Sequence, residues 1–164
     1  LSLSRPVKLT ERILSGTWTL DIDKKSKELL QLKSWTDSED TKYFSGTALY
    51  TQTFNQKKRI KEGEKYVLQF HTINNIAEVV LNGKNLGAIW KKPYEIDITS
   101  ALKKGNNELQ ISVTNTWVNR LIGDAQPDVK EKTTFTTMPF YQKVATLLPS
   151  GLIGPIKIMV FTKK

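Results

Sequence analysis

The chain has 164 residues, no cysteine and a net charge of +9 at pH 7. Its length is typical of one domain, and the lack of cysteine excludes disulfide scaffolds, thiol nucleophiles and metal sites with cysteine ligands. No apolar run approaches the roughly 18 residues that span a bilayer, which excludes a transmembrane helix and argues against a membrane partner. The basic residues are mostly lysines in pairs at predicted turns, such as Lys57-Lys58 and Lys91-Lys92. Scattered lysines of this kind are typical of a solvated surface, so we expect no nucleic-acid partner.

The first residue is Leu1 instead of Met, and the first ten residues contain no apolar stretch long enough for a signal peptide. We therefore expect a segment that was processed or cut from a longer polypeptide. Residues 1–15 are expected to form a lead-in linker or an edge segment. Residues 16–164 are expected to form one domain.

Apolar and polar side chains alternate along most of the chain after residue 16, and this period of two predicts half-buried strands. Helical periodicity is nearly absent, so we expect helix in less than about a tenth of the chain. The exceptions are one possible turn over residues 28–32 and a capped single turn over residues 99–102. Residues 47–54, rich in threonine and aromatics, add a strand. The apolar members of the alternating strands are Trp18, Leu20 and Ile22; Tyr66, Leu68 and Phe70; Ala77, Val79 and Leu81; Tyr94, Ile96 and Ile98; Leu109, Ile111 and Val113; and Ile156, Ile158 and Val160.

Turn residues separate these strands. Asn82-Gly83 follows one strand and precedes Leu86, and this dipeptide predicts a structural hairpin turn because a type I′ turn needs positive φ at both central residues. Short strands at regular spacing, joined by such turns, predict an all-β sandwich or barrel.

Residues 33–45 and 116–150 interrupt the alternation. The second segment is longer than thirty residues, and loops of that length in a compact domain are often functional or partly disordered. The alternative is that it contains a wrapped strand or two that the pattern does not resolve.

Most catalytic motifs are absent. His71 is the only histidine, so a zinc site without cysteine is excluded, and a buried or half-exposed structural role is expected for it. Neither a G-x-S-x-G elbow nor a phosphate-binding glycine loop occurs. Among possible glycosidase acids, Glu78, Glu95 and Asp97 fall on outward strand faces, which leaves Asp124 and Asp128 in the irregular segment.

Aromatic residues near polar ones indicate a carbohydrate surface, because a pyranose needs a flat apolar face and planar polar groups for its hydroxyls. Trp90 with Tyr94 is one such group, and Trp117 with Asn119, Arg120 and Asp124 is another. The alternative is that these tryptophans are core residues, as we expect for Trp18. In that case Arg120 and Asp124 would pair and hold the long loop over a buried Trp117.

Two sets of motifs resemble known carbohydrate-active families. The run from Glu78 to Lys84, ending in Asn-Gly-Lys, resembles the sugar-binding domain of glycoside hydrolase family 2, together with Leu86-Gly87, Pro93-Tyr94, Asp97-Ile98-Thr99, Leu102, Gly105, Asn107 and Leu109. A second set resembles the C-terminal domain of the bacterial α-L-rhamnosidases of glycoside hydrolase family 106. It consists of Ser34-Trp35-Thr36-Asp37, the run from Tyr43 to Ala48, Trp90, Val113-Thr114-Asn115, the run from Trp117 to Asp124, and the run from Pro149 to Pro155.

The resemblance implies a jelly-roll β-sandwich of the galactose-binding domain-like type. In such enzymes the catalytic acids lie in a separate (β/α)₈ barrel of about 250 residues, so no catalytic residue is expected here. The expected function is that of a carbohydrate-binding or substrate-shaping accessory domain, with an α-L-rhamnosidase-like or β-galactosidase-like parent. The alternative is a structural domain that buttresses the barrel without binding sugar.

The resemblance also implies partners and a location. The expected partners are carbohydrate and the catalytic barrel of the same polypeptide, within an exported bacterial enzyme that is periplasmic or extracellular. In family 2 β-galactosidases an acidic loop before the last strand reaches the sugar subsite, and Asp124 lies in the corresponding stretch. No cofactor is expected. Relatives with this fold often carry a structural calcium ion, but no D-x-D-x-D cluster indicates one here.

Overall fold

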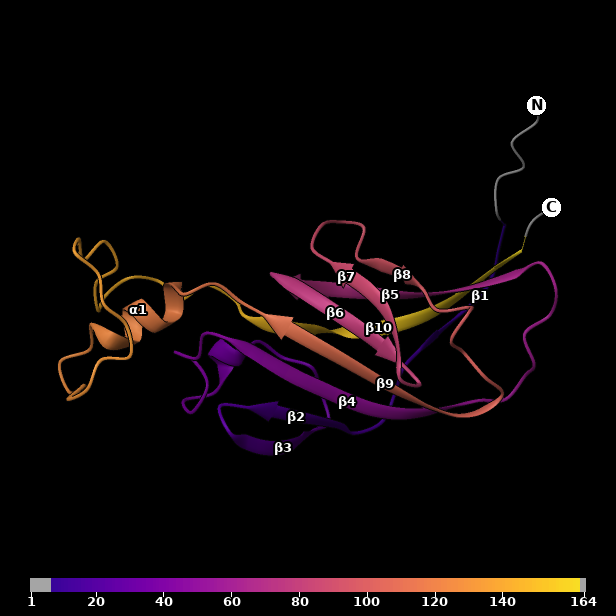
Figure 1. The fold of residues 1–164 in the computed structure, drawn as a ribbon, viewed down its shortest axis with the longest axis horizontal. Coiled ribbons are helices and arrows are strands. Elements are labelled where there is room, and N and C mark those ends of the chain that lie inside the picture. The colour runs from indigo at the N-terminus through magenta and orange to yellow at the C-terminus, as the bar shows by residue number, and fades with distance from the viewer. Residues whose placement is uncertain (1–6, 163–164) are drawn as a thin grey trace, which may run out of the picture.

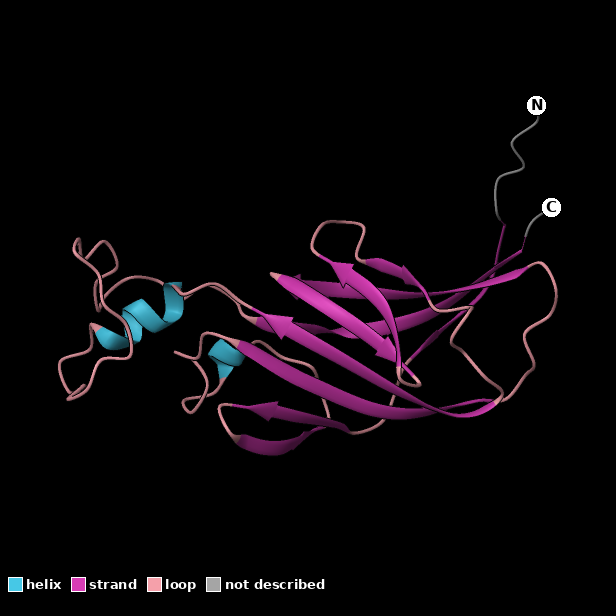
Figure 2. Ribbon diagram, in the orientation of Figure 1, coloured by secondary structure: helices cyan, strands magenta, loops and turns pink. Residues whose placement is uncertain are grey.

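The computed structural model describes residues 7–162, which form two antiparallel sheets packed face to face (Figures 1 and 2). Strands account for 48% of the structure and helix for 6%, which confirms the all-β sandwich. The four-stranded sheet has the order β1 (Val7–Ile13), β10 (Gly151–Thr162), β5 (Glu64–Asn74), β8 (Glu95–Asp97). The six-stranded sheet has the order β3 (Lys25–Leu29), β2 (Trp18–Ile22), β4 (Thr47–Gln56), β9 (Gly105–Thr114), β6 (Ile76–Leu81), β7 (Lys84–Ile89).

The core lies between the sheets and is formed by the alternating apolar positions, such as Trp18 and Leu20 on β2. Tyr50, on β4, is completely buried at its centre. Its hydroxyl oxygen accepts hydrogen bonds from Nε1 of Trp35 at 2.6 Å and from the backbone N–H of Leu152 at 3.1 Å. Because Leu152 belongs to β10, this hydroxyl joins the two sheets. Burial raises the pKa of Tyr50 to about 12.

Asn82 and Gly83 form the two-residue turn between β6 and β7. Their φ angles are 52° and 79°, and the flanking residues Leu81 and Lys84 are paired across the hairpin. The Asn82 side chain also donates to the Ala101 carbonyl oxygen at 2.8 Å. The turn is therefore held by tertiary contacts as well as by its own backbone.

Three segments differ from, or add to, what the sequence indicates. The helical turn expected over residues 28–32 is wrong, because residues 25–29 pair with β2 as strand β3. Residues 7–13 form strand β1, which pairs with β10 at the edge of the four-stranded sheet. Leu1–Pro6, the remainder of the expected lead-in, lie outside the described residues. Within residues 116–150 there is a short helix, α1 (Val118–Asp124), and none of the strands considered as an alternative.

The ends of the strands determine where the irregular segments lie. β9 ends, and β4 and β10 begin, at the same end of the sandwich, so α1 and the residues that follow it project from that end (Figure 1). The connection between β7 and β8 lies on the flank of the sandwich, apart from α1 (Figure 1). No helix among residues 7–162 is long and apolar enough to cross a membrane.

Candidate functional site

Helix α1 is held against the turn that precedes β4. A Cβ atom added to Gly123 would lie 2.7 Å from Cβ and Cγ of Tyr43, so only glycine allows this close approach. The Ser45 hydroxyl donates to the Thr116 carbonyl oxygen at 2.9 Å and accepts from the Arg120 backbone N–H at 3.3 Å. These contacts fix the helix on the end of the sandwich.

Asn119 faces inward from α1 and is 2% exposed. Its Nδ2 donates to the Leu148 carbonyl oxygen at 2.7 Å and to Oγ of Ser150 at 2.8 Å. Its Oδ1 accepts from the Leu148 N–H at 2.8 Å. The amide predicted to meet a sugar is thus fully engaged in fastening the chain just before β10.

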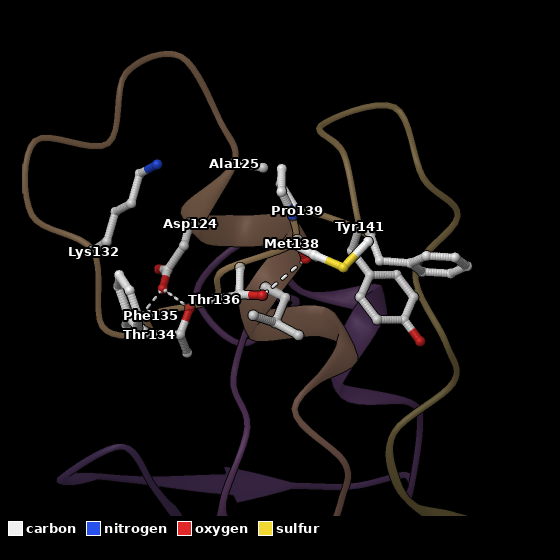
Figure 3. Close-up of a pocket in the computed structure, with 11 residues that line it drawn as sticks. Asp124, Ala125, Lys132, Thr134, Phe135, Thr136, Met138, Pro139 and Tyr141 are labelled. Atoms are coloured by element: carbon white, nitrogen blue, oxygen red, sulfur yellow. Dashed lines mark hydrogen bonds between the residues drawn. The ribbon is translucent and has the colours of Figure 1, made fainter.

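Asp124, at the other end of α1, is 4% exposed and fastens the chain ten residues further on. Its Oδ2 accepts from the backbone N–H of Thr134 at 2.7 Å and from the Thr134 hydroxyl at 2.6 Å (Figure 3). Its Oδ1 lies 3.8 Å from Nη1 of Arg120 and is buried without a hydrogen-bond partner. The ion pair weighed as an alternative is present but long, and the main partner of Asp124 is Thr134.

A third polar side chain on this helical end completes the attachment. Gln126 donates from Nε2 to the carbonyl oxygens of Ile122 and Lys143, each at 3.1 Å. We call residues 134–148 the apical loop. It is bound to the helical end at Thr134, Lys143 and Leu148.

The apical loop exposes large apolar side chains between these anchors. Phe135 is 90% exposed, Phe140 84%, Val144 81% and Met138 79%. Beside them is a hollow of about 500 Å³, lined also by Asp124, Lys132, Thr134, Thr136 and Tyr141 (Figure 3). The sequence does not predict this surface, because the segment lacks periodicity and the exposure of its side chains follows from long-range anchors.

The predicted sugar-site residues fall into two groups. Trp117, Asn119, Arg120 and Asp124 lie together on or beside α1, and Trp117 is 57% exposed, which corrects the alternative in which it is buried. Trp90, 64% exposed, and the half-buried Tyr94 lie apart from them, in the connection between β7 and β8. The structure therefore gives two separate candidate surfaces, one at the α1 end and one at the connection between β7 and β8.

Titratable groups form no metal centre in the described part of the chain. Residues 7–162 contain no group of three or more His, Asp or Glu side chains that could hold a metal ion. His71 is exposed on the outer face of β5, where a buried or half-exposed position was expected.

The comparisons with known proteins agree with this architecture. The model of the family described as "Glycosyl hydrolase 2 galactose-binding domain-like" matches residues 23–145. The chain belongs to this family, as the sandwich and the motif order had indicated.

Particular relatives are large carbohydrate-active proteins. The chain is 38% identical, over an alignment of 183 residues, to a Formosa agariphila protein named provisionally as a β-glucuronidase; the alignment covers 93% of the chain and 16% of that protein. A rhamnosidase structure from Novosphingobium sp. PP1Y matches with a TM-score of 0.88 at 39% identity, over 98% of this chain and 16% of that one. A Ruminococcus gnavus β-glucuronidase, in complex with D-glucuronic acid, shares the fold at 17% identity with a TM-score of 0.67, over 99% of this chain and 32% of that one.

Proposed function

We propose that the chain is a non-catalytic accessory domain of a glycoside hydrolase. We further propose that its α1 end docks against the catalytic part of the same polypeptide and borders the sugar subsite there. The observation that carries this proposal is the apical loop, which exposes large apolar side chains while buried polar anchors hold it in place. Family membership, and relatives of which the chain spans 16%, support the role of one domain among several.

The hydrogen bonds that anchor the apical loop indicate that it is held ready to bind a partner. Exposing Phe135 and Phe140 to water is unfavourable, since burying such a side chain contributes about 1.5–3 kcal/mol. A cluster of exposed apolar groups marks an interaction surface. The bonds from Asp124 and Asn119 limit the conformations of the loop before it binds, which lowers the entropic cost of docking.

The polar groups near the loop suit a sugar. Trp117 and Arg120 lie at the rim of the helical end, and Tyr141, Thr136 and Lys132 line the hollow. They supply the aromatic faces and hydrogen-bonding groups that a pyranose requires. Asp124 acts in this proposal as a clamp that positions the surface, without contacting sugar.

The relatives suggest the class of parent enzyme. An α-L-rhamnosidase-like parent agrees with the 39% identity to the Novosphingobium rhamnosidase, and the Formosa relative adds β-glucuronides as a possible substrate class. A β-galactosidase-like parent is supported by the fold family alone. As part of such an exported enzyme, the domain would act in the periplasm or outside the cell.

Docking is tested by replacing the apolar side chains in the parent enzyme. We expect the double substitution Phe135→Ser and Phe140→Ser to lower kcat/KM at least about tenfold, a loss of about 1.4 kcal/mol in transition-state stabilisation. The matched control is Leu30→Ser, since Leu30 is 84% exposed but lies outside the apical loop. Unchanged activity of the double variant would refute docking of this loop.

A second substitution separates substrate shaping from simple buttressing. The Trp117 side chain is exposed and makes no hydrogen bond among the described residues, so Trp117→Ala should leave the melting temperature of the parent unchanged. If the domain borders the sugar subsite, this variant raises KM. If the domain only buttresses the barrel, KM stays at the level of the unsubstituted enzyme, and the sugar-facing part of the proposal is wrong.

A further inference from the structure

A second hollow lies on the outer face of the four-stranded sheet, on the flank that carries the β7–β8 connection. Its volume is about 570 Å³, and its lining includes Gln69, His71, Lys92, Tyr94, Pro155 and Lys157. We call it the sheet groove. None of these residues belongs to α1 or to the apical loop, so the groove is a separate feature of the domain.

The register of the strands determines which side chains form the floor and the sides of the groove. Lys157 of β10, Gln69 of β5 and Glu95 of β8 are paired in one row across the sheet. His71 lies two residues further along β5, on the same outer face as Gln69. On one side of it the β10 ladder shifts between Ile153 and Ile156, where Pro155 stands out of the pairing.

The connection between β7 and β8 forms the other side. The Phe70 N–H donates to the Tyr94 carbonyl oxygen at 2.9 Å, which holds this segment beside β5. Tyr94 is half-buried, whereas Lys92 and His71 are exposed. Tyr94, whose side chain also packs against the hydrophobic core, and Pro155 therefore flank a floor made of polar side chains.

The charges of the lining have one sign. The groove is lined by two lysines and an imidazole, and by no Asp or Glu side chain. Glu95, beside the groove, accepts from the neutral amide of Gln69 at 2.9 Å, and Glu11 pairs with Lys157 at 3.3 Å, so Lys92 is the lining lysine without an acidic partner among the described residues. Among the described residues, His71 and Lys92 have no hydrogen-bond or ion-pair partner within the chain, so their polar atoms are available to a ligand.

We propose that the sheet groove binds an acidic saccharide, a pyranose that carries a carboxylate. Lys92 and His71 meet the carboxylate and adjacent hydroxyls, and the ring lies between Tyr94 and Pro155. Aromatic and prolyl faces suit the C–H face of a sugar, and an unpaired ammonium group selects an anion. The inference goes beyond the proposed docking of the α1 end and does not depend on it.

The test compares two sugars that differ at a single position. Methyl β-D-glucuronide and methyl β-D-glucoside share a ring, and only the first carries a carboxylate. We expect the glucuronide to shift the amide NMR resonances of His71, Lys92 and Tyr94 in the ¹⁵N-labelled 164-residue chain, and the glucoside to bind at least about tenfold more weakly.

Matched lysine variants locate the site. Lys92→Ala should weaken glucuronide binding at least about tenfold, while Lys103→Ala, at an exposed turn outside the groove, leaves it unchanged. An unaltered melting temperature shows that each variant is folded.

Three results would overturn the inference. Equal affinity for the two glycosides would show that the sheet groove does not prefer a sugar that carries a carboxylate. No resonance shift at the highest soluble glucuronide concentration would exclude a site in this chain. Shifts confined to the apical loop would move the site to the α1 end. None of these results bears on docking, which is measured through the activity of the parent enzyme.

Discussion

Tyr50 connects the two sheets through one hydroxyl group. It accepts from the Trp35 indole and from the Leu152 amide, and it has no access to water. Replacing it with phenylalanine would leave both donors unsatisfied in the core, and each such loss costs about 1–3 kcal/mol. We expect Tyr50→Phe to be destabilising at neutral pH for this reason, although the side chain loses only one oxygen atom.

The same residue predicts a loss of stability in alkali. Its pKa is about 12 in the folded chain against 10.0 for an unperturbed tyrosine, so the folded state retains the proton more strongly. This contribution is complete below pH 10 and is lost as pH rises from about 10 to about 12, by about 2–3 kcal/mol in total. Urea unfolding across that range should show a steeper decline for the unsubstituted chain than for Tyr50→Phe. Parallel curves would mean that Tyr50 is not the group responsible.

Gly83 allows a test of the β6–β7 hairpin. Its φ is +79°, and no atom lies within 4 Å of the position that a Cβ would take. The cost of Gly83→Val is therefore a backbone cost, about 1–3 kcal/mol, because β-branched residues disfavour positive φ. Gly83→Asn is the matched control and should cost less, since asparagine tolerates this region. Equal melting temperatures for Gly83→Val and the unsubstituted chain would contradict the turn.

At the scale of elements, α1 and the apical loop depend on each other. Asp124→Ala removes the acceptor of both Thr134 hydrogen bonds. We expect the unfolding free energy to fall by about 1.5–3 kcal/mol, the range for hydrogen bonds to a charged group, and the Thr134 amide to exchange faster. Asp128→Ala is the control, since Asp128 is exposed and makes no hydrogen bond among the described residues. If Asp124→Ala changed neither the unfolding free energy nor the amide hydrogen exchange of Thr134, the hydrogen bonds from Thr134 to Asp124 would not stabilise the structure.

The sequence predicted the elements that carry a strong period and missed those that depend on distant contacts. Alternation located β2, β5, β6 and β9, because each buries one face against the opposite sheet. Helix α1 has seven residues, one of them glycine, and no side-chain cap, so its sequence carries a weak helix signal. Gly123 is needed for the contact with Tyr43, eighty residues earlier in the chain.

The sequence predicted which residues lie at the candidate site, but not which contacts they make. Trp117, Asn119, Arg120 and Asp124 lie where the strand pattern ends, as expected. Nothing local indicates that Asn119 binds Leu148 or that Asp124 binds Thr134, because those partners are fixed by the course of a long loop. The exposed aromatics of the apical loop were indistinguishable from core residues for the same reason.

At the scale of the whole molecule, residues 7–162 form one sandwich and the helical end that projects from it (Figure 1). We expect the purified chain to hydrolyse neither a nitrophenyl rhamnoside nor a nitrophenyl galactoside, because the (β/α)₈ barrel in which the family resemblance implies the catalytic acids needs about 250 residues. The assay compares the chain with a mock-purified control. Turnover above that control would make the chain an enzyme in its own right.

Docking of the apical loop is the central claim, and the two methionines report on it directly. Met138 lies on the loop and is 79% exposed, whereas Met159 is 4% exposed and serves as an internal reference. Hydrogen peroxide converts accessible methionine to the sulfoxide, which mass spectrometry quantifies at each site. In the isolated chain we expect rapid oxidation of Met138 and slow oxidation of Met159. In the parent enzyme, docking predicts that Met138 is oxidised as slowly as Met159, whereas equally rapid oxidation of Met138 in the chain and in the parent would contradict the claim.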